Sequence, residues 1–147
     1  MKKLYIPPAL IAYCIIVMTL LYFFAPKYNM IVYPLNLIGL GIAFAGFILM
    51  GKARDLFIKH KTTLKIDTSF HLLTEGVYSK TRNPMYLGMF ILVVGFSIFS
   101  TNILALILPI MFLLLVRLIF ITKEEGLIQD KFGEEYDEYK KQVRRWI

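Results

Sequence analysis

Four long apolar stretches constrain the fold of this chain more than any other feature. They run over residues 6–25, 32–50, 84–100 and 103–122. About 20 consecutive apolar residues are needed for a helix to cross roughly 30 Å of hydrocarbon. With 58% hydrophobic residues in a length of 147, the chain is far more apolar than soluble domains are. The sequence therefore predicts an all-α fold: an integral membrane helical bundle with four transmembrane helices, in a single domain over residues 1–147.

Positively charged residues gather on one side of the predicted spans. Two precede the first stretch, seven lie between residues 51 and 83 and six follow residue 122, whereas the 26–31 turn has one and the 100–102 turn none. Because cytoplasmic loops carry the excess of Lys and Arg, this pattern predicts a multi-pass protein with cytoplasmic N- and C-termini. The net charge of +7 is spread over these flanks, so it indicates membrane lipid rather than nucleic acid as a partner.

The segment over residues 51–83 is long for a connection in so small a protein, and loops of this length tend to be functional. It predicts a long cytoplasmic loop with enough apolar side chains to pack against the bundle. The loop ends in TEGVYSKTRNPMYLG (74–88), where Asn83 suits the N-cap and Pro84 the first position of the third helix. The free N–H groups of such a helix start favour an anion.

The tail KEEGLIQDKFGEEYDEYKKQVRRWI (123–147) is charged but keeps a helical period. Its apolar side chains recur at helical spacings, which predicts a C-terminal amphipathic helix interrupted near Gly133. On composition alone, such a helix would lie at the membrane interface and be anchored by Trp146.

Two ionisable residues near the end of the fourth stretch are candidates for a site. Arg117 is an intramembrane cation, which is costly in lipid and usually faces a partner or a cavity. Glu124 follows seven residues later, nearly two α-helical turns, so both side chains are expected on one face. With the helix start at Asn83 and the rings of Tyr78 and Tyr86, they predict a pocket for a ligand that bears both a carboxylate and a cation.

Features of the first two stretches predict packing rather than chemistry. The single cysteine, Cys14, has no metal-ligand companions, so no metal site is predicted. The second stretch carries small residues at helical spacing, Gly39 with Ala43 and Gly41 with Ala45. Such pairs let helices approach closely in lipid.

Two motifs in order carry a resemblance to a known family. GVYSKTRNPMYLG is followed by EEGLIQDKFGEEYDEYKKQVRRW, and together they resemble the isoprenylcysteine carboxyl methyltransferase and phospholipid N-methyltransferase group of integral membrane proteins. The family pattern is G-V-Y, then R-H-P-x-Y-x-G, then E-E, then F-G-x-x-Y-x-x-Y and a basic end. The resemblance covers residues 69–146, which it identifies as a cofactor-binding half.

The resemblance implies a methyltransferase that uses S-adenosyl-L-methionine within the membrane. Its acceptor would be a lipophilic small molecule, such as a prenylcysteine-type carboxylate. The cofactor-binding residues that the motifs imply are Phe70, His71, Leu72, Leu73, Tyr78, Asn83, Pro84, Met85, Tyr86 and Glu124.

The chain departs from the family pattern at three places. Asn83 stands where the family has the His of R-H-P, and Phe70 stands where a His opens the earlier cofactor segment, with His71 next to it. The family's substrate-contacting Arg, four residues before the cofactor Glu, is Phe120 here. Either Arg117, about one turn earlier, orients the acceptor in its place, or the acceptor lacks a carboxylate.

Two other functions are compatible with the sequence. A membrane reductase of related architecture would bind NADPH, although it would want extra basic residues for the phosphate, and the E-E pair fits it poorly. A non-catalytic membrane scaffold is the second alternative. The residues identify neither the methyl acceptor nor the oligomeric state.

Overall fold

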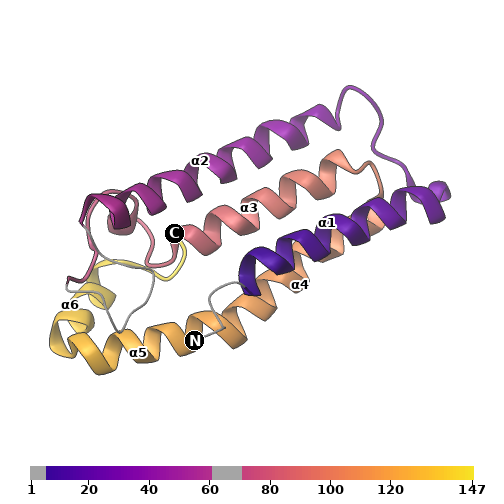
Figure 1. The fold of residues 1–147 in the computed structure, drawn as a ribbon. Coiled ribbons are helices and arrows are strands. Elements are labelled where there is room, and N and C mark those ends of the chain that lie inside the picture. Colours follow the sequence, from indigo (N-terminus) through magenta and orange to yellow (C-terminus); the bar gives the residue numbers. More distant parts are fainter. Residues whose placement is uncertain (1–5, 61–70) are drawn as a thin grey trace.

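The computed structural model describes residues 6–60 and 71–147, and the elements in these ranges are helical (Figure 1). The expected cofactor residue Phe70 lies outside the described residues. The helices are α1 (Ile6–Phe24), α2 (Leu37–Lys59), α3 (Pro84–Phe99), α4 (Ile107–Leu115), α5 (Thr122–Phe132) and α6 (Glu134–Gln142). The predicted all-α class is confirmed for this part of the chain.

Among the described residues, three helical segments are long and apolar enough to cross a membrane. They are Pro7–Phe24 with 18 residues, Leu37–Lys59 with 23 and the continuous segment Ile103–Phe132 with 30. The fourth apolar helix, Pro84–Phe99, has 16 residues, fewer than the usual minimum of about 17 for a span. The predicted number of four transmembrane helices therefore stays a prediction.

The boundaries of two predicted helices are wrong. The helix expected over 32–50 begins at Leu37 and continues to Lys59. The residues after Met50 include good helix formers, and Ala53 among them is completely buried. The helix expected over 103–122 likewise continues without a break to Phe132. Hydropathy located the ends of the apolar segments, whereas the helical backbone hydrogen bonds continue beyond these ends in both helices.

Helix α3 lies between α2 on one side and α1 and α4 on the other (Figure 1). Glycines bring the backbones of α2 and α3 together: a Cβ on Gly39 would lie 2.5 Å from the carbonyl oxygen of Gly95, and one on Gly46 would lie 2.6 Å from that of Gly88. Gly41, in contrast, has open space around it. The predicted close contact of the second helix is therefore made by its Gly39 face.

The segment Ile103–Phe132 is irregular in its middle, where Val116–Ile121 forms a π-helical turn between α4 and α5. Pro109 lies in the first turn of α4, where a missing N–H costs no α-helical hydrogen bond. A π turn holds about one residue more than an α turn. It therefore turns Arg117 away from the helix face that carries Glu124.

The tail forms two helices and then folds back. α5 ends at Phe132, the chain turns at Gly133 with φ +50°, and α6 follows. This confirms the predicted interruption near Gly133. Beyond α6, Trp146 packs partly buried against the cluster of core residues between the helices. The side chain expected to anchor the tail at the membrane interface is packed on the bundle instead.

The end of the bundle away from α6 is held by one buried amide, that of Asn102. Its Nδ2 donates to the carbonyl oxygens of Leu21 and Ala25, each at 3.1 Å, and to Oδ1 of Asn29 at 2.8 Å. Its Oδ1 accepts from the N–H of Leu104 at 3.1 Å. Asn102 thus joins the end of α1 to the turn before α4.

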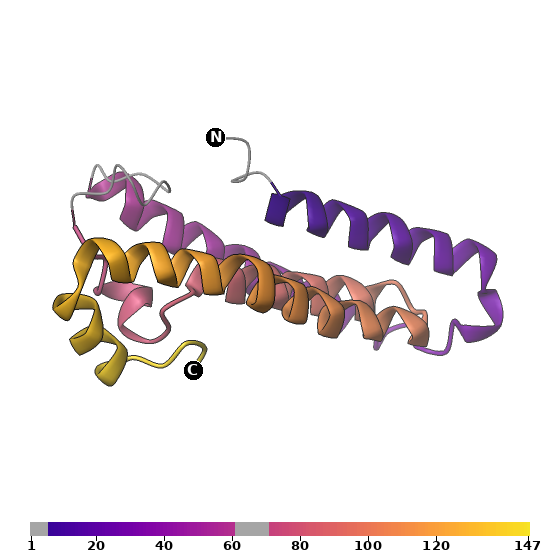
Figure 2. The same cartoon turned by 90° about the horizontal axis from the view of Figure 1, so that it is seen from below.

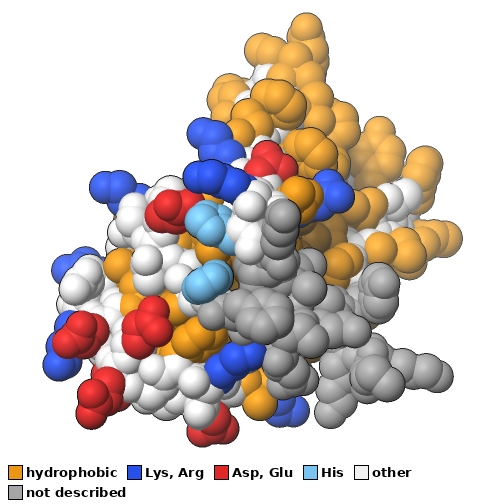
Figure 3. All heavy atoms as spheres, turned by 60° about the vertical axis from the view of Figure 1, so that its left-hand side comes forward, with side chains coloured by type: hydrophobic (Ala, Val, Ile, Leu, Met, Phe, Trp, Pro, Cys, Tyr) orange, Lys and Arg blue, Asp and Glu red, His pale blue; other side chains and the backbone are white. Residues whose placement is uncertain are grey.

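The two ends of the molecule differ in surface character. Seen from below, α1 extends beside the other helices while α5 and α6 fold together at the opposite end (Figure 2). Charged side chains and the two histidines gather at the end near α5, α6 and the last turns of α2, whereas the helices that lead away are covered by hydrophobic side chains (Figure 3). Phe23 in α1 and Phe44 in α2 are examples of the large apolar side chains that are exposed on these helices.

Candidate functional site

A cavity of about 210 Å³ lies at the charged end of the bundle. Its walls come from the first residues of α1, the last turns of α2, the 71–83 segment, the start of α3, and the helices α5 and α6. The lining residues are Pro7, Pro8, Phe57, His71, Leu72, Leu73, Tyr78, Arg82, Asn83, Pro84, Met85, Tyr86, Met89, Glu124, Glu125, Ile128, Phe132, Tyr136 and Tyr139.

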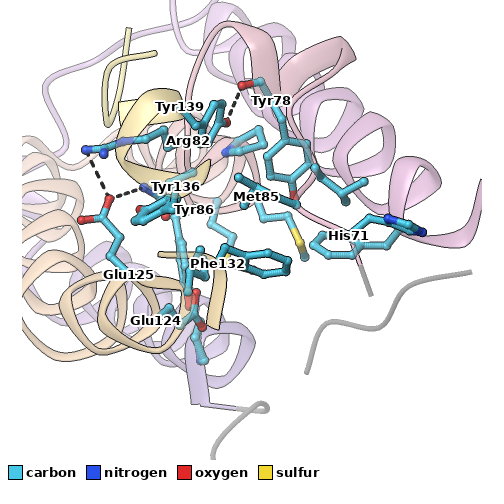
Figure 4. A pocket seen from close by; sticks show the side chains of 18 of the residues that line it. His71, Tyr78, Arg82, Met85, Tyr86, Glu124, Glu125, Phe132, Tyr136 and Tyr139 are labelled. Carbon is cyan, nitrogen blue, oxygen red and sulfur yellow. Dashed lines mark hydrogen bonds and ion pairs between the residues drawn. The ribbon is translucent and has the colours of Figure 1, made fainter. Parts of the chain in front are cut away.

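The cofactor-binding residues expected from the motifs converge on this cavity (Figure 4). Each of them that the structure describes is a lining residue, from His71 to Glu124. They belong to three separate segments: the 71–78 stretch, the start of α3 and the start of α5. His71 is exposed, whereas Asn83 and Tyr86 are buried. The fold thus brings the motifs together in space.

Glu124 and Tyr86 form the polar contact between α5 and α3. The Tyr86 hydroxyl donates to Oε1 of Glu124 at 2.6 Å. Both side chains line the cavity, and Tyr86 is buried among the core residues below it. The hydrogen bond fixes one carboxylate oxygen, and the carboxylate as a whole remains an acceptor for a ligand that carries hydroxyl or ammonium groups.

The 3-10 turn Gly76–Ser79 places Tyr78 in the wall. The turn starts at Gly76, whose φ of +60° is a backbone angle that favours glycine. The Tyr78 ring packs edge to face on the ring of Phe57, with 5.8 Å between the two centroids. The backbone carbonyl oxygen of Tyr78 accepts a hydrogen bond of 2.5 Å from the Tyr139 hydroxyl. Burial raises the pKa of both tyrosines above the ordinary value, so both hydroxyls stay protonated at neutral pH.

Glu125, next to Glu124, is the centre of a second polar network. Its carboxylate accepts hydrogen bonds from Nε and Nη2 of Arg145, at 3.2 Å and 2.5 Å, and from Nδ2 of Asn83 at 3.4 Å. Nη2 of Arg82 lies 3.5 Å from the same carboxylate. The side chains of Glu125 and Arg82 are only 14% and 11% exposed. Hydrogen bonding to Glu125 raises the pKa of Arg145, so its charge is retained.

Two buried side chains beside the cavity carry polar atoms that have no hydrogen-bond partner within residues 6–60 and 71–147. These are the Nε and Nη1 atoms of Arg82 and the hydroxyl of Tyr136. The Arg82 guanidinium lies 5.9 Å from the centroid of the Tyr136 ring. Burial, with a smaller effect of the Glu125 charge, raises the pKa of Tyr136 to about 12. Buried polar groups without partners are uncommon, and beside a cavity they suit a polar ligand.

Several residues of the site were not singled out from the sequence. Arg82, Glu125, Tyr136 and Tyr139 line the cavity and carry its second network. Their signal was present in the motifs, because R-N-P, E-E and F-G-x-x-Y-x-x-Y contain all four. Phe57 had no such signal, since it reaches the cavity only through the unexpected extension of α2.

Arg117 is not brought to the cavity. Its side chain is exposed and is not among the lining residues, and the π turn separates its face from that of Glu124. Phe120, at the place of the family's substrate Arg, packs partly buried against the bundle core. The role of Arg117 in orienting an acceptor stays a prediction.

The described residues offer binding groups rather than a metal centre. No group of three His, Cys, Asp or Glu residues suited to a metal ion occurs in residues 6–60 and 71–147. The cavity combines aromatic and aliphatic walls with a carboxylate and a guanidinium. It therefore suits a ligand with a flat apolar part and charged groups at its edges.

A family model described as phospholipid methyltransferase matches residues 30–135 of the chain. The protein-S-isoprenylcysteine O-methyltransferase of Schizosaccharomyces pombe is 32% identical over 87 residues, which are 57% of this chain and 36% of that protein. An uncharacterized protein of Haemophilus influenzae is 36% identical over 63 residues, which are 43% of this chain and 100% of that protein.

A solved structure has the same fold. The eukaryotic intramembrane Ras methyltransferase, isoprenylcysteine carboxyl methyltransferase, matches over 100% of this chain and 53% of its own length, with a TM-score of 0.70 and 23% identity. The chain thus spans about half of that protein. These matches confirm the resemblance seen in the motifs. Since the family model covers most of its length and three of its helices are long and apolar enough to span a bilayer, this chain is an integral membrane protein that belongs to the phospholipid methyltransferase family.

Proposed function

We propose that the chain transfers a methyl group from S-adenosylmethionine to a lipophilic acceptor within the membrane. The observation that carries this proposal is the convergence of the G-V-Y, R-N-P-M-Y and E-E motifs on one cavity. Tyr86 and Glu124, which are 38 positions apart, meet there in one hydrogen bond. Motifs scattered along the chain are expected to meet only where they share a ligand or a structural core.

The cavity fits the methyl donor in its chemistry. Glu124 offers a carboxylate to hydroxyl or ammonium groups, and the unpartnered N–H groups of Arg82 suit an anion. Tyr78, Met85 and Phe132 provide apolar walls for a flat ring. The expected binding residues His71, Leu72, Leu73, Asn83 and Pro84 complete the lining, and we include them in the proposed site.

When bound, S-adenosylmethionine would supply an electrophilic methyl group to the acceptor's nucleophile, and S-adenosylhomocysteine would be the second product. The residues of the chain then mainly align the reactants and exclude water. Tyr86 and Glu124 hold their side chains fixed through the 2.6 Å hydrogen bond. The apolar walls keep water away from the reacting atoms, where a hydroxide would compete with the acceptor.

We further propose that the site faces the cytoplasm. The charged end of the molecule carries the cavity (Figure 3), and the Lys and Arg distribution favours this end as the cytoplasmic one. In this arrangement both termini are cytoplasmic and α3 is the shortest of four spans. The acceptor would enter from the lipid. Because the S. pombe relative is a protein-S-isoprenylcysteine O-methyltransferase, a prenylcysteine carboxylate is the first acceptor to test.

Calorimetry on the detergent-solubilised protein tests the proposal. We expect S-adenosylhomocysteine to bind and Glu124→Gln to weaken this binding at least tenfold, about 1.4 kcal/mol, because a charge-assisted hydrogen bond is lost. Glu138→Gln, which changes an exposed carboxylate on α6, is the matched control and should bind like the unmodified protein. Binding of NADPH alone would overturn the proposal in favour of a reductase, and binding of neither compound would favour a scaffold.

A further inference from the structure

Residues 143–147 form a strap that runs from the end of α6 back across the wall of the cavity. The N–H of Arg82 donates to the carbonyl oxygen of Arg144 at 3.1 Å. The buried hydroxyl of Thr81 donates to the carbonyl oxygen of Arg145 at 3.0 Å. The strap therefore pairs with the chain immediately before α3, although 64 positions separate Thr81 from Arg145.

Side chains of the strap also hold it in place. Val143 is buried with Tyr136 and Tyr139, and Trp146 packs against the bundle core cluster that includes Tyr86. In addition, Arg145 reaches Glu125 through two nitrogens at 3.2 and 2.5 Å. A two-point contact between a guanidinium and a carboxylate fixes orientation as well as distance.

Glu125 passes this constraint on to the cavity wall. The same carboxylate holds Asn83 at 3.4 Å and Arg82 at 3.5 Å. Asn83 is the residue before the first turn of α3, and its N–H is held by the Thr81 hydroxyl at 3.3 Å. Two guanidinium groups and one amide therefore share a single carboxylate at the place where α3 faces the cavity.

We propose that the ion pair of Glu125 with Arg145 is a positioning device that locks the strap onto the cavity wall and so prepares the wall for the methyl donor. This inference rests on the proposed function for the identity of the ligand. The strap lies beyond residues 30–135, to which the family model extends. Arg145 acts through Glu125 and Asn83, and it is a positioning residue because it is not among the residues that line the cavity.

The expected effect follows from pre-organisation. A wall that is already ordered binds its ligand more tightly, because the entropy of ordering it is not lost on binding. Release of the strap should therefore weaken donor binding about tenfold and leave the chemical step nearly unchanged. By reciprocity, bound donor should hold the strap more firmly in place. Since Arg145 is 32% exposed, added salt should weaken the pair and with it donor binding.

Arg145→Met tests the device, and Arg144→Met is its matched control. The two residues are neighbours, and both substitutions keep the carbonyl oxygens that pair with Arg82 and Thr81. The Arg144 side chain is exposed, whereas Arg145 makes the two contacts with Glu125. Arg145→Lys keeps the charge but loses the two-point geometry, so it should give an intermediate result.

Trp146 provides a readout that needs no ligand. It is the one tryptophan of the chain and lies in the strap. Release of the strap should shift its emission to the red and increase its quenching by acrylamide. The second readout is the Kd of S-adenosylhomocysteine at low and high salt, and the third is the comparison of donor KM with kcat.

We expect Arg145→Met to release Trp146, to raise the Kd of S-adenosylhomocysteine about tenfold and to remove its salt dependence, with kcat within twofold. Unchanged Trp146 emission, a released strap with unchanged Kd, or an equal loss in Arg144→Met would each overturn the proposal. If Trp146 is released but even the unmodified protein binds no S-adenosylhomocysteine, the proposed function fails, and with it the coupling to a donor.

Discussion

Asn102 and Tyr136 are buried polar side chains at opposite ends of the bundle, and they are satisfied to different degrees. Asn102 is 0% exposed and uses both atoms of its amide, in four hydrogen bonds that join α1 to the turn before α4. Tyr136 is 2% exposed, and its hydroxyl has no hydrogen-bond partner among the described residues. The hydrogen bonds of Asn102 are all made within the chain, whereas the Tyr136 hydroxyl lies beside a cavity with its hydrogen-bonding capacity unused.

This difference separates stability from binding. A buried polar group that is fully hydrogen-bonded stabilises the fold, whereas one without a partner costs about 1–3 kcal/mol until a ligand or water satisfies it. We therefore expect substitutions at the Asn102 end to change the free energy of unfolding and those at the cavity to change ligand affinity. Where the native polar group has no partner, its removal is expected to raise the free energy of unfolding instead of lowering it.

The largest effect is expected for Asn102→Leu. The change removes the donor to Oδ1 of Asn29 and the acceptor of the Leu104 N–H. The carbonyl oxygens of Leu21 and Ala25 lose their bonds to Asn102 and keep only those from the backbone N–H groups of Ala25 and Tyr28. We expect a loss of about 3 kcal/mol in the free energy of unfolding, measured by denaturant unfolding in detergent. The Kd of S-adenosylhomocysteine for the folded protein should not change. A change of more than about fivefold, roughly 1 kcal/mol, would contradict the separation between the two ends.

Tyr136→Phe should act in the opposite direction. Removal of a buried hydroxyl without a partner should stabilise the unliganded protein by about 1 kcal/mol, because the ring and its packing are retained. If the hydroxyl contacts the donor, the Kd of S-adenosylhomocysteine should rise severalfold in the same variant. Thermal unfolding with and without the ligand measures both effects. A destabilised unliganded variant would show that the hydroxyl has a partner within the fold.

Alkaline pH provides a smaller test of the same end. The pKa of Tyr136 in the folded protein is about 12, above the value of about 10 in an unfolded chain. Because the unfolded chain ionises first, the stability of the folded protein relative to the unfolded chain starts to fall above pH about 10 and continues to fall towards pH about 12. We expect the melting temperature to fall over this range and to fall less in Tyr136→Phe. An equal fall in both proteins would assign the effect to other groups, such as the lysines.

The smallest effect is expected for Arg117→Leu. The side chain is exposed and does not line the cavity, so donor Kd and acceptor turnover should both stay within about twofold, under 0.5 kcal/mol. A radiolabelled methyl-transfer assay on total lipid extract measures turnover. A tenfold loss of turnover at unchanged donor Kd would instead support the role in orienting the acceptor that the sequence predicts for this residue.

Hydropathy predicted where the helices are but not where they end. It located α1, α3 and the cores of α2 and the Ile103–Phe132 segment. It missed the last turns of α2 because Lys52 and Arg54 lower the hydropathy without disfavouring a helix. The π turn at Val116–Ile121 had no signal, since its residues suit an α-helix equally well. That single turn was enough to invalidate the expected shared face of Arg117 and Glu124.

The motifs predicted which residues line the cavity, whereas the contacts that hold these residues in place could not be predicted from the sequence. The N-cap logic at Asn83 and the resemblance both indicated the residues that line the cavity. The pairing of Arg145 with Glu125, 20 positions away, is a choice among many possible partners in a charged tail. Such pairings depend on how α6 turns back at Gly133, which is a tertiary feature.

The 30-residue helical segment Ile103–Phe132 runs without a break from the apolar part of the molecule to the cavity. At about 1.5 Å per residue it is roughly 45 Å long, which exceeds the hydrocarbon thickness of about 30 Å. A helix of this length responds to a thinner bilayer by tilting, and Glu124 and Glu125 move with it because no break separates them from the apolar part. Donor affinity should therefore depend on the acyl-chain length of the lipids, because a change in bilayer thickness tilts the helix and so moves the cavity wall.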